Sequence, residues 1–165
     1  MFEPKPLTRE AIPAALEKAV RYRLLNEPSD AESICHDVLR IDPDNEQALI
    51  TLLLAITDRF SKGYAVGSAK AHEILARLRS EYDRVYYSGL IAERRAKALL
   101  AQNMPGTCFD AHELLREAMT YYESAEALRP AQNDDALLRW NACARIIDTN
   151  RLEARAIEPP GTTME

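Results

Sequence analysis

Apolar side chains recur at intervals of three and four residues along most of this chain, which is the spacing of one face of an α-helix. Clusters of proline, glycine and short polar residues interrupt the pattern and indicate where helices begin and end. The chain has few β-branched runs and only five glycines, so the pattern predicts an all-α fold. We expect seven helices with short connections, over about 8–26, 29–41, 44–62, 67–81, 83–102, 107–129 and 133–156.

Side chains that can cap a helix mark most of these predicted starts. Ser29 and Glu32 have the spacing of a capping box, in which each side chain accepts a hydrogen bond from a free N–H of the first turn. Asp44 and Gln47 repeat that spacing at the third helix. The other expected caps are Thr8, Gly67 with Ser68, Asp83, Thr107 and Asn133.

Small residues repeat along the chain where neighbouring helices must touch. Ala31, Ala71 and Ala111 are forty residues apart, each near the start of an even-numbered predicted helix. A tighter frame of about 34 residues joins Ala19 and Tyr22 in the first helix to Ala31 and a closing Pro43. Both spacings predict helix pairs that stack on one another.

The 34-residue frame resembles the tetratricopeptide repeat (TPR), a helix–turn–helix unit with an aromatic, small residues and a closing proline at fixed places. The resemblance is clear at both ends of the chain and weaker in its middle, where the turn at 61–68 is long for the family. Further positions that match the frame are Gly89, Ala118, Tyr122, Ala125, Pro130, Trp140 and Ala144.

The resemblance implies an α-solenoid of about three antiparallel helix pairs with a C-terminal capping helix. We expect one helical domain over 8–156, an N-terminal extension over 1–7 and a flexible tail over 157–165. Another kind of α-helical bundle is the alternative that the residues leave open.

The charge of the chain and its hydropathy bear on which partners it can bind. The net charge is −5, which argues against general nucleic-acid binding. Residues 1–58 and 98–165 each carry 6 basic and 11 acidic side chains, whereas residues 59–97 carry 9 basic and 4 acidic ones. No apolar run approaches 18 residues, so we expect no membrane span.

Metal and cofactor chemistry is not indicated by the residue spacing. Cys35, Cys108 and Cys143 lie far apart in apolar helical patterns without a CxxC motif, which favours free core thiols in a reducing cytoplasm. Two His-Glu pairs, at 72–73 and 112–113, lack the second histidine four residues on that a zinc protease helix requires. We therefore expect no metal, no cofactor and no catalytic site.

The TPR resemblance implies that odd-numbered helices line a groove for a peptide or a partner helix. On the last helix it points to Asn141 and Arg145, which share one face at a spacing of four residues. The fifth helix combines aromatic and cationic side chains, a composition common at interfaces; its candidates are Tyr86, Tyr87, Arg94 and Arg95.

The sequence therefore predicts a protein-binding scaffold without catalysis. Two alternatives stay open: a structural protein that associates with itself through oppositely charged faces, and a small helical enzyme or metal protein.

Overall fold

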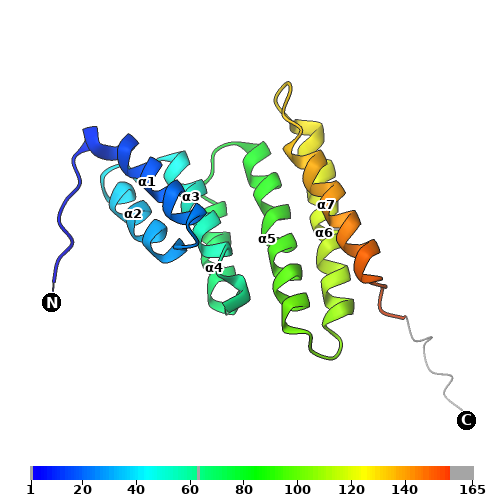
Figure 1. The fold of residues 1–165 in the computed structure, drawn as a ribbon. Helices are drawn as coiled ribbons and strands as arrows, with labels where there is room; N and C mark the ends of the chain where they lie inside the picture. The colour runs from blue at the N-terminus through cyan, green and yellow to red at the C-terminus, as the bar shows by residue number, and fades with distance from the viewer. Residues whose placement is uncertain (1, 63, 157–165) are drawn as a thin grey trace, which may run out of the picture.

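Seven α-helices follow one another through the part of the chain that the computed structural model describes, residues 2–62 and 64–156 (Figure 1). These residues contain no β-strand, which confirms the all-α prediction. A short 3₁₀ turn, Arg9–Ala11, precedes the first helix, and a second one, η2 (Phe60–Lys62), precedes the fourth. The helices are α1 (Ile12–Leu24), α2 (Pro28–Ile41), α3 (Glu46–Thr57), α4 (Tyr64–Leu75), α5 (Glu81–Gln102), α6 (Thr107–Leu128) and α7 (Asp135–Asn150).

Each helix packs against the next one in the chain, and α1 also contacts α3. The helices therefore form a row, with α1 and α2 at one end and α6 and α7 at the other (Figure 1). The most extensive contact joins α5 to α6, the two longest helices at 22 residues each. Packing between sequence neighbours lets each helix bury its apolar stripe locally.

Helix α5 separates two large apolar clusters. Ile91 and Ala98 lie in the cluster built by α1 to α4, whereas Ala92 and Ala96 lie in the cluster built with α6 and α7. A smaller cluster joins α1, α2 and α3 through Ile12, Leu16, Val38 and Ala48. Helix α5 is therefore buried on two sides. Charged side chains of α5 that lie between the two clusters are enclosed by neighbouring helices.

The small and aromatic residues of the predicted repeat frame are mostly buried. Ala19, Ala31, Ala118, Tyr122 and Ala125 have no exposed surface, and Ala71 and Ala111 are equally buried. Gly89 faces Tyr122 so closely that a Cβ atom would lie 2.8 Å from the ring. Tyr22, Trp140 and Ala144 pack against the clusters from their edges, while Pro43 and Pro130 are exposed in the turns after α2 and α6.

The predicted capping box at the second helix is wrong. Helix α2 begins one residue earlier, at Pro28, whose fixed φ and missing N–H suit the first helical position. Glu32 does not cap the helix; its carboxylate binds Arg59 and accepts a hydrogen bond of 2.5 Å from Lys70 on α4. Burial would raise the pKa of Glu32, but the bond from Lys70 and the charge of Arg59 outweigh burial and lower it.

Other predicted helix limits shift by a few residues. Asn45 caps α3 instead of Asp44, and Ser80 caps α5 instead of Asp83. Thr107 is the first residue of α6 and follows Gly106, and the Thr8 side chain makes no capping hydrogen bond. The largest differences are at the start of α1 at Ile12, the end of α3 at Thr57, both ends of α4 at Tyr64 and Leu75, and the end of α7 at Asn150, where Arg151 adopts a left-handed conformation. The predicted tail at 157–165 lies outside the described residues.

Candidate functional site

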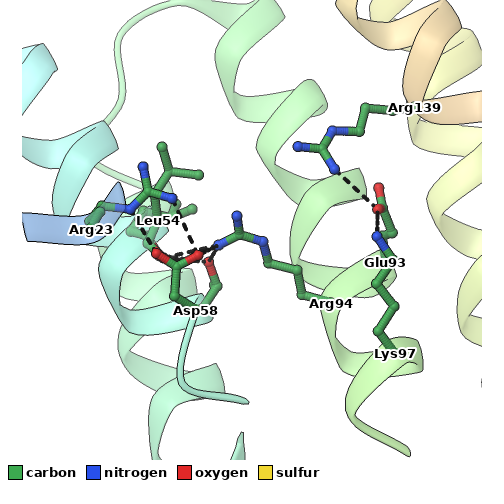
Figure 2. A network of polar contacts seen from close by, with 9 residues as sticks. Arg23, Leu54, Asp58, Glu93, Arg94, Lys97 and Arg139 are labelled. Carbon is green, nitrogen blue, oxygen red and sulfur yellow. Dashed lines mark hydrogen bonds and ion pairs between the residues drawn. The ribbon is translucent and has the colours of Figure 1, made fainter. Parts of the chain in front are cut away.

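Ion pairs connect the four odd-numbered helices along one side of the row. Arg23 of α1 and Arg94 of α5 meet at Asp58, the residue that follows α3. The preceding residue of α5, Glu93, binds Arg139 of α7. Figure 2 shows the two groups side by side, with Arg94 directed toward Asp58 and Arg139 directed toward Glu93.

Asp58 forms ion pairs with two arginines at once. Arg23 donates to both carboxylate oxygens, from Nε to Oδ2 at 2.7 Å and from Nη2 to Oδ1 at 3.2 Å. Arg94 Nη1 lies 2.8 Å from Oδ1. Two-pronged pairing of this kind fixes the orientation of both groups, so it sets how α1 and α5 meet the end of α3.

Arg94 also donates hydrogen bonds to the C-terminal end of α3. Its Nη1 donates to the Leu54 carbonyl oxygen at 2.9 Å and to Thr57 Oγ1 at 2.5 Å (Figure 2 shows Leu54). The Leu54 carbonyl oxygen also accepts from the backbone N–H of Asp58 at 2.9 Å, so Arg94 contributes a cation at the negative end of the helix dipole. Burial lowers the pKa of the Arg94 guanidinium and Asp58 acts in the opposite direction, so Arg94 stays protonated at neutral pH.

Glu93 is a carboxylate with no exposed side-chain surface. Tyr122 of α6 donates a hydrogen bond to Oε2 at 2.6 Å, and Lys97 and Arg139 contact Oε1 at 2.5 and 3.2 Å. The three donors come from α5, α6 and α7, so this one acceptor joins the last three helices. A buried carboxylate is tolerated because its donors replace the water that it has lost.

These contacts determine the protonation state of the site. Burial would raise the pKa of Glu93, but hydrogen bonds from Lys97 and Tyr122 and the charge of Arg139 outweigh burial and lower it. Burial and the nearby Glu93 charge raise the pKa of Tyr122. At neutral pH Glu93 is therefore ionised and Tyr122 keeps the proton that it donates.

A cleft of about 290 Å³ lies beside the Asp58–Arg94 pair and the side chains of Lys97 and Arg139. The ends of α3 and η2, together with α5 and α7, line it. Three cations contribute to its wall, Arg94, Lys97 and Arg139, against one carboxylate, Asp58. Lys97 and Arg139 keep 45% and 36% of their side-chain surface exposed. The cleft can therefore offer two partly solvated cations to an anionic group.

The predicted aromatic anchors do not line this cleft. Tyr86 packs edge-on against Tyr87, with ring centroids 5.0 Å apart, and lies 5.7 Å from the ring of Tyr122. It also stacks on Tyr82 at 5.7 Å. Burial raises the pKa of both Tyr86 and Tyr87. Tyr87 packs against the apolar cluster of α1 to α4, and Tyr86 packs against the cluster built with α6 and α7.

The predicted cations and amide are spread over different surfaces. Arg94 lies in the cleft, while Arg95, the next residue of α5, is partly buried outside it. Asn141 lines a separate hollow of about 300 Å³ between α6 and α7, beside Trp140 and Glu123. Arg145 is exposed on α7. The structure does not bring Asn141 or Arg145 together with Arg94.

Sequence reasoning did not select the residues that complete the site. Asp58 lies inside the predicted third helix, just after its apolar run, and Arg139 directly precedes Trp140, the aromatic of the repeat frame. The spacing of Glu93 and Lys97 by four residues is a recognisable helical ion pair. No local pattern pairs Asp58 with Arg94 or Glu93 with Arg139, because each pair is separated by more than 30 residues.

The cysteines are only partly as expected. Cys35 and Cys143 are buried core thiols, and burial raises the pKa of each to about 12. Cys108 is exposed, so its predicted core position is wrong. Within residues 2–62 and 64–156, no three metal-ligating side chains gather.

The fold and the site define an all-helical protein with a cation-lined cleft on its odd-numbered helices. Comparisons with protein-family models, with curated proteins and with solved structures found no match. In the described part of the chain, no helix has the length and apolar character needed to cross a bilayer.

The pH dependence of stability should follow Glu93 and Glu32. The pKa of each carboxyl in the folded chain is lower than its ordinary value of 4.5, so the stability that each contributes is present above that value and is lost as the pH falls through the lowered pKa. We expect the melting temperature to be nearly constant from about pH 7 to about pH 5 and to fall below about pH 4.5, as followed by circular dichroism. Glu93→Gln should flatten the acid decline; an unchanged decline would contradict this assignment.

Proposed function

We propose that this protein is a non-catalytic interaction scaffold, an α-solenoid of TPR type with three helix pairs and α7 as a closing helix. Buried small residues on the repeat frame and the packing of each helix on the next support this architecture. In such a stack the odd-numbered helices share one face, which is the side that carries the ion pairs and the cleft.

The ligand that we propose is an extended acidic peptide segment. The single observation that carries this proposal is the cleft between α3, α5 and α7, with three cations against one carboxylate. Lys97 and Arg139 are held in place through Glu93 but remain partly exposed, so they are positioned before a ligand arrives. Preorganised cations bind a carboxylate with less loss of side-chain entropy than free ones.

Arg94 has a supporting role in this proposal. Its guanidinium is engaged by Asp58, Leu54 and Thr57, so its charge contributes to the cleft while its hydrogen bonds hold α3 against α5. Binding is passive and requires no cofactor.

Selection from a library of random twelve-residue peptides tests the proposal. We expect the enriched peptides to be acidic and to bind with micromolar affinity, measured by isothermal titration. Lys97→Gln/Arg139→Gln should weaken binding of an enriched peptide by about tenfold, because two charge-assisted contacts are lost. The melting temperature of the variant should be measured alongside, since both side chains also bind Glu93.

Arg145→Gln is the matched control, because it removes an exposed cation from the same helix outside the cleft. It should leave affinity unchanged. The proposal fails if no peptide is enriched, if the enriched peptides are not acidic, or if the double variant binds as tightly as the parent.

A further inference from the structure

A second concave surface lies on the even-numbered helices, away from the cleft. It is a groove of about 500 Å³ between α2 and α4, with Leu39, Leu52 and Ile74 contributing apolar surface. Arg40, Lys70 and Arg77 contribute cations. The lining also includes His36 and a single carboxylate, Glu73. The groove therefore combines apolar contact surface with net positive charge.

Two of the three cations of this groove are engaged by other groups of the same chain, and Arg40 is the third. Lys70 binds Glu32, and Arg77 donates to the Pro43 carbonyl oxygen at 2.5 Å. Arg40 is exposed at the C-terminal end of α2 and lies on the lining of the groove. Its charge is thus available to an incoming acidic group.

The start of α7, at the other end of the row, combines exposed apolar side chains with acidic ones, and so complements the apolar and basic groove. Leu137 and Leu138 remain 37% and 61% exposed, although apolar side chains of a terminal helix gain most by burial. Asp134 and Asp135 precede them, and both are exposed. Arg129 binds Asp134 at 2.8 Å, which leaves Asp135 as the less neutralised carboxylate.

We propose that a second copy of this chain occupies the groove, and that it inserts the start of α7 between α2 and α4. Leu137 and Leu138 would contact the apolar surface of the groove while Asp135 approaches Arg40. The charge of the two surfaces agrees with this pairing, because three cations of the groove lie beside a single carboxylate and residues 98–165 carry an excess of five acidic side chains. The contact uses none of the residues that line the odd-helix cleft, so it is independent of peptide binding.

The contact joins two different surfaces of the same molecule. Reciprocal insertion closes a pair as a two-fold dimer, whereas one-way insertion leaves one groove and one α7 end free, so that further copies add until a larger ring closes or an open chain forms. The apolar part provides attraction at short range, and the charges orient the approach. Assembly should therefore grow with concentration and weaken with salt.

Sedimentation equilibrium measures how the weight-average mass depends on concentration and salt. The weight-average mass should rise from the monomer value of 18.6 kDa to at least twice that value as concentration increases. In about 1 M NaCl the screening length is about 3 Å, and the mass should return toward the monomer. A mass that stays at 18.6 kDa at all concentrations would overturn the proposal.

Charge exchange tests the specific contact. Arg40→Glu and Asp135→Lys should each reduce the association constant by about tenfold or more, because each places like charges together. The double variant Arg40→Glu/Asp135→Lys should recover association, since the pair is restored with its signs exchanged. The double variant has the parent's net charge, so Arg40→Glu/Asp30→Lys, which has that same net charge, is the control for it and should not recover association.

Two matched controls separate the contact from effects on the helices. Arg21→Glu reverses an exposed cation on α1, and Asp30→Lys reverses an acidic residue in the first turn of α2, as Asp135→Lys does in α7. Both controls should associate like the parent. Association that both single variants leave unchanged would show that a different surface is used and would refute the proposal.

Discussion

Glu93→Leu should lower the free energy of unfolding by about 2–3 kcal/mol, because it removes the acceptor of the buried Tyr122 hydroxyl. Leucine occupies much of the space of the lost side chain, so the cavity term is small. Lys97 and Arg139 are partly exposed and can turn to water, so their unpairing adds little. Urea denaturation monitored by circular dichroism gives the value.

A double-mutant cycle identifies the cause of this loss. Tyr122→Phe alone should cost about 1–2 kcal/mol, since Glu93 loses a donor but keeps Lys97 and Arg139. Glu93→Leu/Tyr122→Phe should cost clearly less than the sum of the two, because neither variant side chain leaves a polar atom unpaired. Additive effects would show that the hydrogen bond is not the source of the stability.

Glu117→Leu is the matched control for the carboxylate. Glu117 is exposed on α6, and the same substitution there should change stability by less than about 0.5 kcal/mol. A control loss as large as that of Glu93→Leu would attribute the effect to leucine and not to the buried contact.

Gly89→Val should destabilise the protein by about 3 kcal/mol and Gly89→Ala by about 1–2 kcal/mol. A Cβ atom at position 89 would lie 2.8 Å from Cε1 and 3.0 Å from Cδ1 of Tyr122. The ring cannot move aside easily, because it is fully buried and its hydroxyl is held by Glu93. Overpacking exceeds the gain of about 1 kcal/mol in helix propensity that alanine has over glycine.

Ser88→Ala is the control for Gly89→Ala, because it changes a neighbouring, partly buried position of α5 without adding a Cβ atom to a crowded site. Its effect should be within about 0.5 kcal/mol of the parent. Melting temperature and urea midpoint should both fall in the order Ser88→Ala, Gly89→Ala, Gly89→Val. An increase in stability for Gly89→Ala would mean that α5 and α6 are farther apart at this point than the structure places them.

Helix number and approximate position could be predicted from the sequence, whereas the caps were often wrong. Periodic apolar positions depend on the 3.6-residue turn of a single helix, so they are visible in a short window. A capping residue cannot be assigned in this way where adjacent residues are equally suitable, because helix packing decides which of them lies at the N-cap position. At α3 Asp44 and Asn45 are both good capping residues, and the Asn45 side chain is the one that accepts from Ala48 N–H, at 2.9 Å.

Among the candidate binding residues, only Arg94 lies in the cleft. Tyr86 and Tyr87 have a composition that is common at interfaces, yet here they pack between helices. Aromatic side chains bury large areas wherever they go, so composition alone does not distinguish a core position from a contact surface. Asn141 and Arg145 share a helix face as predicted by their spacing, but that face is not turned toward the cleft.

The sequence by itself determined the all-α class, the helical segments and the small residues at which helices meet, because these depend on local periodicity and side-chain size. The tertiary structure alone decided that Arg23 and Arg94 share Asp58 and that Glu93 is enclosed by Tyr122 and Arg139. Ion pairs between residues more than 30 positions apart depend on the angle and register at which whole helices pack. No local pattern encodes these quantities, so the cleft became visible only when the helices were placed together.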